Sequence, residues 1–400
     1  MEQVNRSNAP SGRALTDWLY AKASQMKVPL SGTFELSPVC NFACRMCYVR
    51  KTPREVEASP RKILTLEDWR RIAREGAESG LLYILLTGGE PLLWPDFWTL
   101  YDELIDMGML VSINTNGSLI DEKAIAHFVR KPPLKISITL YGANDATYKK
   151  LCGINGVFSR VDRAVRGLTE AGIAVKLNCS LTPDNAGDLE WIAGYAKQRG
   201  AVLAATSYMF PPIRRGQCSF EDNERFTPEE AAKYQMLYLL HDRGPQRYRN
   251  YLEHILAGYA DPPGLDEGCV DPVDGRIRCR AGSASFWITW DGWMTPCGLM
   301  PEPKVDLKQS EFNAAWNSLT AACSQVKLSG VCDQCPNRRI CHTCAAIAYA
   351  ETGSAEGIPI YKCRMTQRLH EIARKTLGGE SPADDQQKSC VNNLPGGNEI

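Results

Sequence analysis

The 400-residue chain carries 46 basic and 46 acidic side chains and 44% hydrophobic residues, so its composition is globular and its formal net charge is zero. This balance excludes a broadly polyanion-binding surface, and we expect no nucleic-acid partner, because nucleic-acid binders carry a basic excess. No apolar run reaches the roughly 18–20 residues that span a bilayer, and the polar first residues contain no signal-peptide core, so we expect a cytoplasmic protein without a membrane partner.

Residues 1–31 form an N-terminal extension with one short helical pattern at Leu15–Gln25, which is too short for a separate domain. Residues 32–207 then alternate between apolar, β-rich runs and segments with helical periodicity. The six strand candidates are Gly32–Leu36, Leu82–Leu86, Leu110–Asn114, Leu134–Leu140, Ala174–Ser180 and Val202–Ser207. The helix candidates are Leu66–Ser79, Phe97–Met107, Asp121–Val129, Val157–Ala171 and Leu189–Arg199. This alternation predicts an α/β fold, a partial, TIM-like (β/α)6 barrel with its ligands at the carboxyl ends of the strands.

Three further segments follow the predicted barrel. Residues 208–268 contain proline pairs and the tyrosine-rich helical stretch Glu229–Tyr259, which predicts a helical bridging segment. Residues 269–377 form a small cysteine-rich domain. Polar and apolar residues alternate there around Asp291-Gly292, which predicts a β-hairpin that brings Cys279 and Cys297 together at its open end. Residues 378–400 have no apolar periodicity, which predicts a disordered tail.

Three cysteines with the spacing C-x3-C-x2-C directly follow the first predicted strand: Cys40, Cys44 and Cys47. Three thiolates on one loop can bind a 4Fe-4S cluster and leave one iron open to another ligand. The alternative is a zinc site completed by a distant histidine. None of the five histidines lies near this loop in the sequence, and its position at a strand end favours the cluster.

This loop resembles the cluster loop of the radical S-adenosylmethionine (radical SAM) superfamily. The resemblance implies that the open iron binds the amino and carboxylate groups of S-adenosyl-L-methionine. Reductive cleavage of this cofactor would then yield a 5′-deoxyadenosyl radical that abstracts a substrate hydrogen. The residue before the third cysteine is usually aromatic in the family and is Met46 here. Tyr48 could replace that ring and pack near the adenine.

Polar residues at the following strand ends match other family motifs. Gly88-Gly89-Glu90 closes the second predicted strand and resembles the motif that holds the methionine amino group. By the same resemblance, Asn116, Ser137 and Asn178 would contact the ribose or carboxylate of the cofactor, although each also fits a plain turn or cap. Three residues are candidates for a cationic partner of the cofactor carboxylate, and the sequence does not choose between them: Lys149, Lys150 and Arg160.

The C-terminal cysteines form a second pattern. The segment from Cys332 to Cys344 alone is typical of a zinc knuckle. Together with the other cysteines it resembles the SPASM extension of radical SAM enzymes, which carries auxiliary 4Fe-4S clusters. The family pattern implies one cluster on Cys332, Cys335, Cys341 and Cys363, and another on Cys279, Cys297 and Cys344. Cys269 could be the fourth ligand of the latter, or one iron stays open. The spacing between Cys341 and Cys344 is x2 here and usually x3 in the family.

Three functions remain open. The leading hypothesis is a maturase that cross-links or oxidises a ribosomally made peptide, with a separate leader-binding protein as a possible partner and a flavodoxin or ferredoxin as reductant. The second is a radical enzyme acting on a small metabolite. The third is a metal-binding scaffold with zinc in its C-terminal module. Gly298 follows Cys297 where formylglycine-forming relatives place a basic aspartate, which disfavours that reaction. No catalytic acid or base can be assigned.

Overall fold

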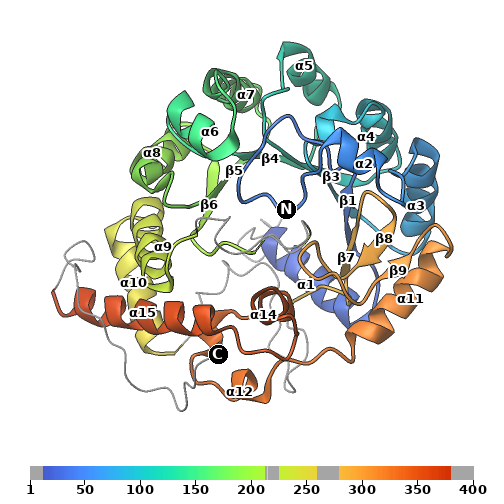
Figure 1. Cartoon of the computed structure of the whole chain (residues 1–400). Coiled ribbons are helices and arrows are strands. Elements are labelled where there is room, and N and C mark those ends of the chain that lie inside the picture. Colours follow the sequence, from blue (N-terminus) through green and yellow to red (C-terminus); the bar gives the residue numbers. More distant parts are fainter. Residues whose placement is uncertain (1–11, 212–213, 215–224, 259–278, 380–400) are drawn as a thin grey trace, which may run out of the picture.

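Parallel strands form the centre of the molecule (Figure 1), and β1 to β6 are the strands of the barrel. The computed structural model describes residues 12–211, 214, 225–258 and 279–379. Each strand pairs with its neighbour in the sequence, so the spatial order is that of the chain. The strands are β1 (Ser31–Glu35), β2 (Tyr83–Thr87), β3 (Leu110–Thr115), β4 (Lys135–Thr139), β5 (Val175–Ser180) and β6 (Val202–Thr206). The predicted partial (β/α)6 barrel is confirmed.

The helices surround the outer face of the strands (Figure 1). The five predicted ones are α3 (Leu66–Glu78), α4 (Phe97–Asp106), α5 (Glu122–Arg130), α7 (Phe158–Glu170) and α8 (Leu189–Gln198). Their apolar faces pack on the sheet. For example, Trp69 of α3 stacks on Phe34 of β1 with ring centres 4.8 Å apart, and both side chains are fully buried. Thr65 and Asp68 form a capping box at the start of α3, which fixes where this helix begins.

Two helices near the first cysteines were not predicted, α2 (Pro53–Glu57) and α6 (Asp145–Cys152). Asn144 caps α6 by accepting a hydrogen bond from the Thr147 N–H. Gly153 ends this helix in the left-handed region, with a φ of 67°. At eight residues, α6 is too short to show a clear helical periodicity in the sequence.

The predicted hairpin consists of β7 (Ser285–Ile288) and β8 (Trp293–Thr295), which pair antiparallel. Unexpectedly, β7 also pairs in parallel with β1, and β9 (Val305–Asp306) adds a further antiparallel strand, so the barrel and the hairpin share one nine-stranded sheet. At Gly32 a Cβ would come within 2.4 Å of the Phe286 ring, so a glycine in β1 is what allows β7 to pack this closely. The aromatic ring of Phe286 in turn packs on α11 (Phe312–Cys323).

The remaining helices lie beside the open edge of the barrel (Figure 1). α1 (Gly12–Met26) confirms the predicted N-terminal helix. The predicted helical stretch in the bridging segment is two helices, α9 (Pro228–Arg243) and α10 (Pro245–Leu256), because Gly244 and Pro245 interrupt it. The cysteine-rich region adds α12 (Gly330–Asp333), α13 (Arg338–Cys341), α14 (Ala345–Thr352) and α15 (Ile360–Leu377).

The predicted disordered tail lies, from residue 380 on, outside the described residues. The same is true of Cys218, Cys269 and Cys390. Within the described ranges, no helix combines the length and the apolar character needed to cross a membrane.

Candidate functional site

The three N-terminal cysteines lie on the loop between β1 and α2, at the carboxyl end of β1. Their thiols are partly buried and free of disulfides. The Phe42 N–H donates to the Cys40 Sγ at 3.3 Å, and the Arg50 N–H donates to the Cys47 Sγ at the same distance. Backbone N–H donors to sulfur are typical of cysteines that bind iron–sulfur clusters, where such bonds tune the reduction potential. The donor set therefore fits a cluster.

Helix α6 supports this loop from the other side. The Ala43 N–H donates to the Cys152 carbonyl at 2.9 Å, and the Arg45 N–H donates to the Leu151 carbonyl at 3.1 Å. Cys152 is fully buried, as is common for a cysteine that packs as a small hydrophobic side chain. The unpredicted helix thus holds the middle of the cysteine loop in place.

The Gly88-Gly89-Glu90 turn lies directly against the start of the cysteine loop. The Gly89 N–H donates to the Ser37 carbonyl at 2.7 Å, and the Glu90 N–H donates to the Val39 carbonyl at 2.9 Å. A Cβ at Gly88 would come within 2.3 Å of the Ser37 oxygen, and a Cβ at Gly89 within 2.4 Å of the Val39 oxygen. Both glycines are therefore required by the close approach of two backbone segments of this chain, in addition to any role toward a ligand.

The Glu90 carboxylate is completely buried and joins the ends of β2 and β3. It accepts hydrogen bonds from the Thr115 hydroxyl at 2.8 Å, the Asn116 N–H at 2.8 Å and the Leu92 N–H at 3.1 Å. Burial outweighs these bonds and raises the pKa of Glu90 to about 7. Acceptance of a bond from a ligand ammonium stays a prediction, and the three contacts give this carboxylate a structural role as well.

The raised pKa of Glu90 predicts a pH-dependent stability of the cluster-free protein. Because the folded-state pKa of about 7 lies above the ordinary value of 4.5, this group's stabilising contribution is complete below pH 4.5 and is lost as the pH rises through 7. Compared with Glu90→Gln, the wild-type free energy of unfolding should fall by about 3 kcal/mol more between pH 4.5 and pH 8. Urea unfolding at several pH values measures this difference, and parallel pH profiles of the two proteins would contradict the assignment.

Asn116 lies in a small polar network beside Cys40. Its side-chain N–H group donates to the Asn41 Oδ1 at 2.8 Å and approaches the Cys40 Sγ at 3.8 Å. Its Oδ1 accepts bonds from the N–H and the hydroxyl of Ser118. The side chain therefore orders the cysteine loop, and a cofactor contact from it stays a prediction.

The other predicted contact residues lie on the neighbouring strands. Ser137 is buried in β4, and Asn178 is half-buried in β5, opposite Thr139. Among the candidate cations, Lys149 and Arg160 are exposed, and Lys150 forms an ion pair with Asp184 at 2.7 Å. These positions do not select one cation as the partner of a cofactor carboxylate.

Tyr48 lies near a buried ion pair that the sequence did not predict. The Glu35 carboxylate, at the end of β1, is 0% exposed and accepts two bonds from the Arg214 guanidinium at 2.8 and 3.0 Å. The Trp287 Nε1–H of β7 donates to the same carboxylate at 2.8 Å. Burial raises the pKa of the Tyr48 hydroxyl above its usual range; the charge of Arg214 opposes this shift and that of Glu35 adds to it. These bonds connect the end of β1, the hairpin and the segment after β6.

The C-terminal thiols form two groups. Burial, with the nearby thiols of Cys344 and Cys279, raises the pKa of Cys297 to about 12. Burial, with the thiols of Cys341, Cys332 and Cys335, raises the pKa of Cys363 to about 11. All seven are free of disulfides.

This division into three and four thiols is the one that the SPASM resemblance implies. In the described part of the chain, no three His, Cys, Asp or Glu side chains lie close enough together to hold a single metal ion. Ligands of a four-iron cluster bind different irons, so they are spaced more widely than the ligands of one ion. Cluster binding by these thiols stays a proposal.

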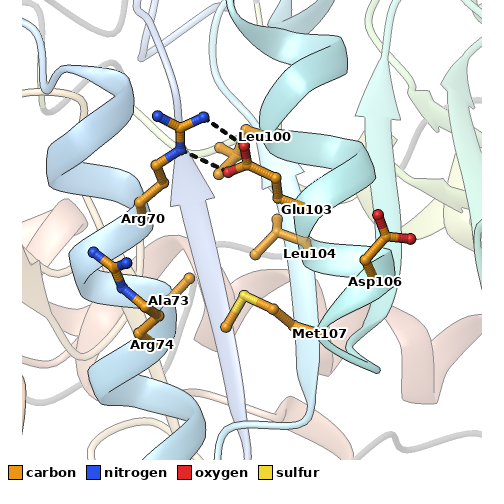
Figure 2. A pocket seen from close by; sticks show the side chains of 8 residues that line it. All are labelled: Arg70, Ala73, Arg74, Leu100, Glu103, Leu104, Asp106 and Met107. Atoms are coloured by element: carbon orange, nitrogen blue, oxygen red, sulfur yellow. Dashed lines mark hydrogen bonds and ion pairs between the residues drawn. The ribbon is translucent and has the colours of Figure 1, made fainter.

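A separate groove of about 420 Å³ lies between α3 and α4 on the outside of the barrel (Figure 2). An ion pair crosses it, in which the Arg70 Nε–H donates to the Glu103 carboxylate at 2.7 Å. Its lining contains no cysteine and none of the predicted site residues; it consists of Arg70, Ala73, Arg74, Leu100, Glu103, Leu104, Asp106 and Met107. The groove therefore lies outside the candidate site.

The fold is a partial barrel, and three cysteines that form no disulfide lie at the end of its first strand. Residues 34–196, which run from the end of β1 into α8, match the model of the Radical SAM superfamily. This stretch of the chain is therefore a radical SAM domain, and the SPASM character of the cysteine-rich region stays a proposal.

Similar proteins carry different functions. The AdoMet-dependent heme synthase of Methanosarcina barkeri is 26% identical over 334 residues, which cover 80% of this chain and 92% of that protein. The subtilosin biosynthesis protein AlbA of Bacillus subtilis is 22% identical over 335 residues, covering 80% and 68%. The structure of Streptococcus suis SuiB bound to its precursor peptide SuiA superposes with a TM-score of 0.60 at 16% identity, covering 91% of this chain and 83% of SuiB.

Proposed function

We propose that Cys40, Cys44 and Cys47 bind a 4Fe-4S cluster that holds S-adenosyl-L-methionine at its open iron. The observation that carries this proposal is the loop itself, with three cysteines outside any disulfide, two backbone N–H donors to sulfur, and the Gly88-Gly89-Glu90 turn hydrogen-bonded to its start. When bound, the cluster supplies the electron that cleaves the cofactor. The protein's part is to orient the cofactor, with Gly88, Gly89, Glu90, Asn116, Ser137, Asn178 and Tyr48 as the proposed contacts.

We propose further that the C-terminal thiols hold two auxiliary 4Fe-4S clusters, one on Cys332, Cys335, Cys341 and Cys363, and one on Cys279, Cys297 and Cys344. In each group, nearby thiols contribute to the raised pKa of one member. Cys344 and Cys279 act on Cys297, and Cys341, Cys332 and Cys335 act on Cys363, which supports this division. Cys269, the candidate for a further ligand, lies outside the described residues. The barrel (32–207), the bridging segment (208–268) and the cluster domain (269–377) are the proposed domains, although the hairpin strand β7 is paired with β1 of the barrel.

The substrate that we propose is a ribosomally made peptide, which the enzyme cross-links or oxidises. The support is the AlbA relative, which serves bacteriocin biosynthesis, and the likeness in fold to SuiB, whose structure contains its precursor peptide. A small metabolite is the second candidate. The heme synthase of M. barkeri favours it, since that relative aligns over 92% of its own length.

Formation of formylglycine is disfavoured by the structure around Gly298. A Cβ at this position would come within 3.0 Å of the Trp287 ring. An aspartate there would be tight against the indole that donates to Glu35, which would have to shift by a few tenths of an ångström. With glycine at this position, the chain lacks the base that this reaction uses in the family.

Anaerobic incubation with S-adenosyl-L-methionine and reductant tests the two substrate classes. Candidate peptides are taken from short reading frames beside the gene and are deuterated at all side-chain carbons. An iron tetrapyrrole is the small-molecule probe. Transfer of deuterium from a peptide into 5′-deoxyadenosine, with loss of two hydrogens from the peptide, supports the maturase. Conversion of the tetrapyrrole alone would contradict it, and the Cys40→Ala/Cys44→Ala/Cys47→Ala variant controls for background cleavage.

A further inference from the structure

Arg338 is a buried arginine inside the cysteine-rich region. It starts α13, between Cys335 and Cys341, and only 7% of its surface is exposed. One nitrogen, Nη1, forms an ion pair with Asp333. The other two, Nε and Nη2, are buried without a hydrogen-bond partner among the described residues. A buried donor without an acceptor is energetically unfavourable, and more so when it is charged, so an acceptor in this space is expected.

This guanidinium lies near a thiol of the second group. The positive charge of Arg338 acts on the Cys332 thiol, which also lies near Cys335 and Cys341. The backbone holds the arginine in place, because the Arg338 N–H donates to the Cys335 carbonyl at 3.0 Å. The two free N–H groups therefore belong to the same loop as three of the four proposed ligands.

A second cation, the half-buried Lys362, precedes the fourth proposed ligand, Cys363, on α15. Its ammonium lies 5.2 Å from the centre of the Tyr208 ring and 3.9 Å from the Met365 sulfur. In the described ranges, no carboxylate lies within ion-pair distance of it. The nearby Glu351 carboxylate instead accepts bonds from Arg225 and from the Tyr208 hydroxyl.

The charges near Lys362 are therefore mainly those of cysteines. Besides Glu351, the groups that act on its ammonium are the thiols of Cys341 and Cys344. An ammonium withdrawn from water needs a compensating negative charge. Lys362 thus lies near Cys341 of the second group and near Cys344 of the first, while Arg338, paired with Asp333 through Nη1, keeps two nitrogens without an acceptor among the described residues.

We infer that Arg338 and Lys362 are positioning residues that neutralise the auxiliary cluster on Cys332, Cys335, Cys341 and Cys363, with the free N–H groups of Arg338 donating to its sulfur atoms. This inference rests on the proposed function. Reduction adds negative charge to a cluster whose thiolates are already negative. Hydrogen bonds and cations near the sulfurs stabilise the reduced form and raise the reduction potential. The arrangement makes this cluster an easier electron acceptor than one without these cations.

The test is a redox titration of the auxiliary clusters, followed by electron paramagnetic resonance. The full-length protein carries Cys40→Ala, Cys44→Ala and Cys47→Ala in all samples, so that the catalytic cluster does not contribute. The signal that Cys363→Ala removes identifies the relevant cluster. Arg338→Gln and Lys362→Gln should each retain iron and shift the midpoint potential of this cluster to more negative values. Arg364→Gln, which removes an exposed charge next to Cys363, should leave the potential nearly unchanged.

Unchanged potentials in both variants, with iron retained, would overturn the inference. Absence of iron from the parent protein would instead refute the proposed auxiliary clusters. If Arg338→Gln loses its cluster, Arg338→Lys decides the role of the arginine, because it keeps the charge but lacks the forked N–H donors. A lower potential in Arg338→Lys supports the proposed hydrogen bonds, and a wild-type potential excludes them.

Discussion

Arg214→Met should lower the free energy of unfolding by about 3–5 kcal/mol, the usual cost of removing one partner of a buried ion pair. The Glu35 carboxylate is fully buried, and Arg214 supplies two of its three hydrogen bonds. Without the guanidinium, a negative charge would remain inside the barrel with only the Trp287 indole as a donor. Urea unfolding followed by tryptophan fluorescence measures the effect.

Two further variants separate this explanation from a general loss of packing. Arg54→Met removes an exposed arginine from α2 and should change the stability by less than about 0.5 kcal/mol. The double variant Glu35→Gln/Arg214→Met removes both charges, so it should recover much of the lost stability. A double variant as unstable as Arg214→Met, or less stable, would contradict the role of the uncompensated charge.

The second large effect concerns the cysteine loop. Cys40→Ala/Cys44→Ala/Cys47→Ala should reduce the formation of 5′-deoxyadenosine under anaerobic reducing conditions to the level without enzyme. The reason is that no thiolate remains at the strand end to hold the cluster. The measurement is chromatography of the cleavage product after incubation with S-adenosyl-L-methionine and dithionite.

Cys179→Ala is the matched control for this variant. Cys179 is a buried cysteine of β5 outside the motif, so its replacement should retain cleavage. Cleavage by the triple variant at a rate close to wild type would show that another site cleaves the cofactor. If Cys179→Ala loses cleavage although its iron is retained, replacing a barrel cysteine outside the loop also abolishes activity. The loss in the triple variant would then not be specific to the loop.

The barrel strands could be predicted because each is a short apolar run between turn residues. Each observed strand begins or ends within one or two residues of its prediction, as for β5 (Val175–Ser180). The parallel pairing of β7 with β1 could not be predicted, because it joins segments some 250 residues apart and depends on the glycine at position 32. Helix α6 was missed because it is short.

In the candidate site, too, contacts between residues far apart in the sequence could not be predicted. The spacing C-x3-C-x2-C indicated that Cys40, Cys44 and Cys47 share one loop, whereas the grouping of the C-terminal cysteines came from the SPASM resemblance and stays a prediction. The Glu35–Arg214 pair gave no signal, since its partners are 179 residues apart and either residue alone is typical of a surface. The unsatisfied N–H groups of Arg338 could be found only once the surrounding residues were placed in space.

The iron, sulfide and zinc content of protein purified without oxygen tests the central claim most directly, with the Cys40→Ala/Cys44→Ala/Cys47→Ala variant measured beside it. Three 4Fe-4S clusters predict about 12 irons in the wild type and about 8 in the variant. About four irons, with zinc that the variant retains, would keep the radical SAM barrel but contradict the auxiliary clusters.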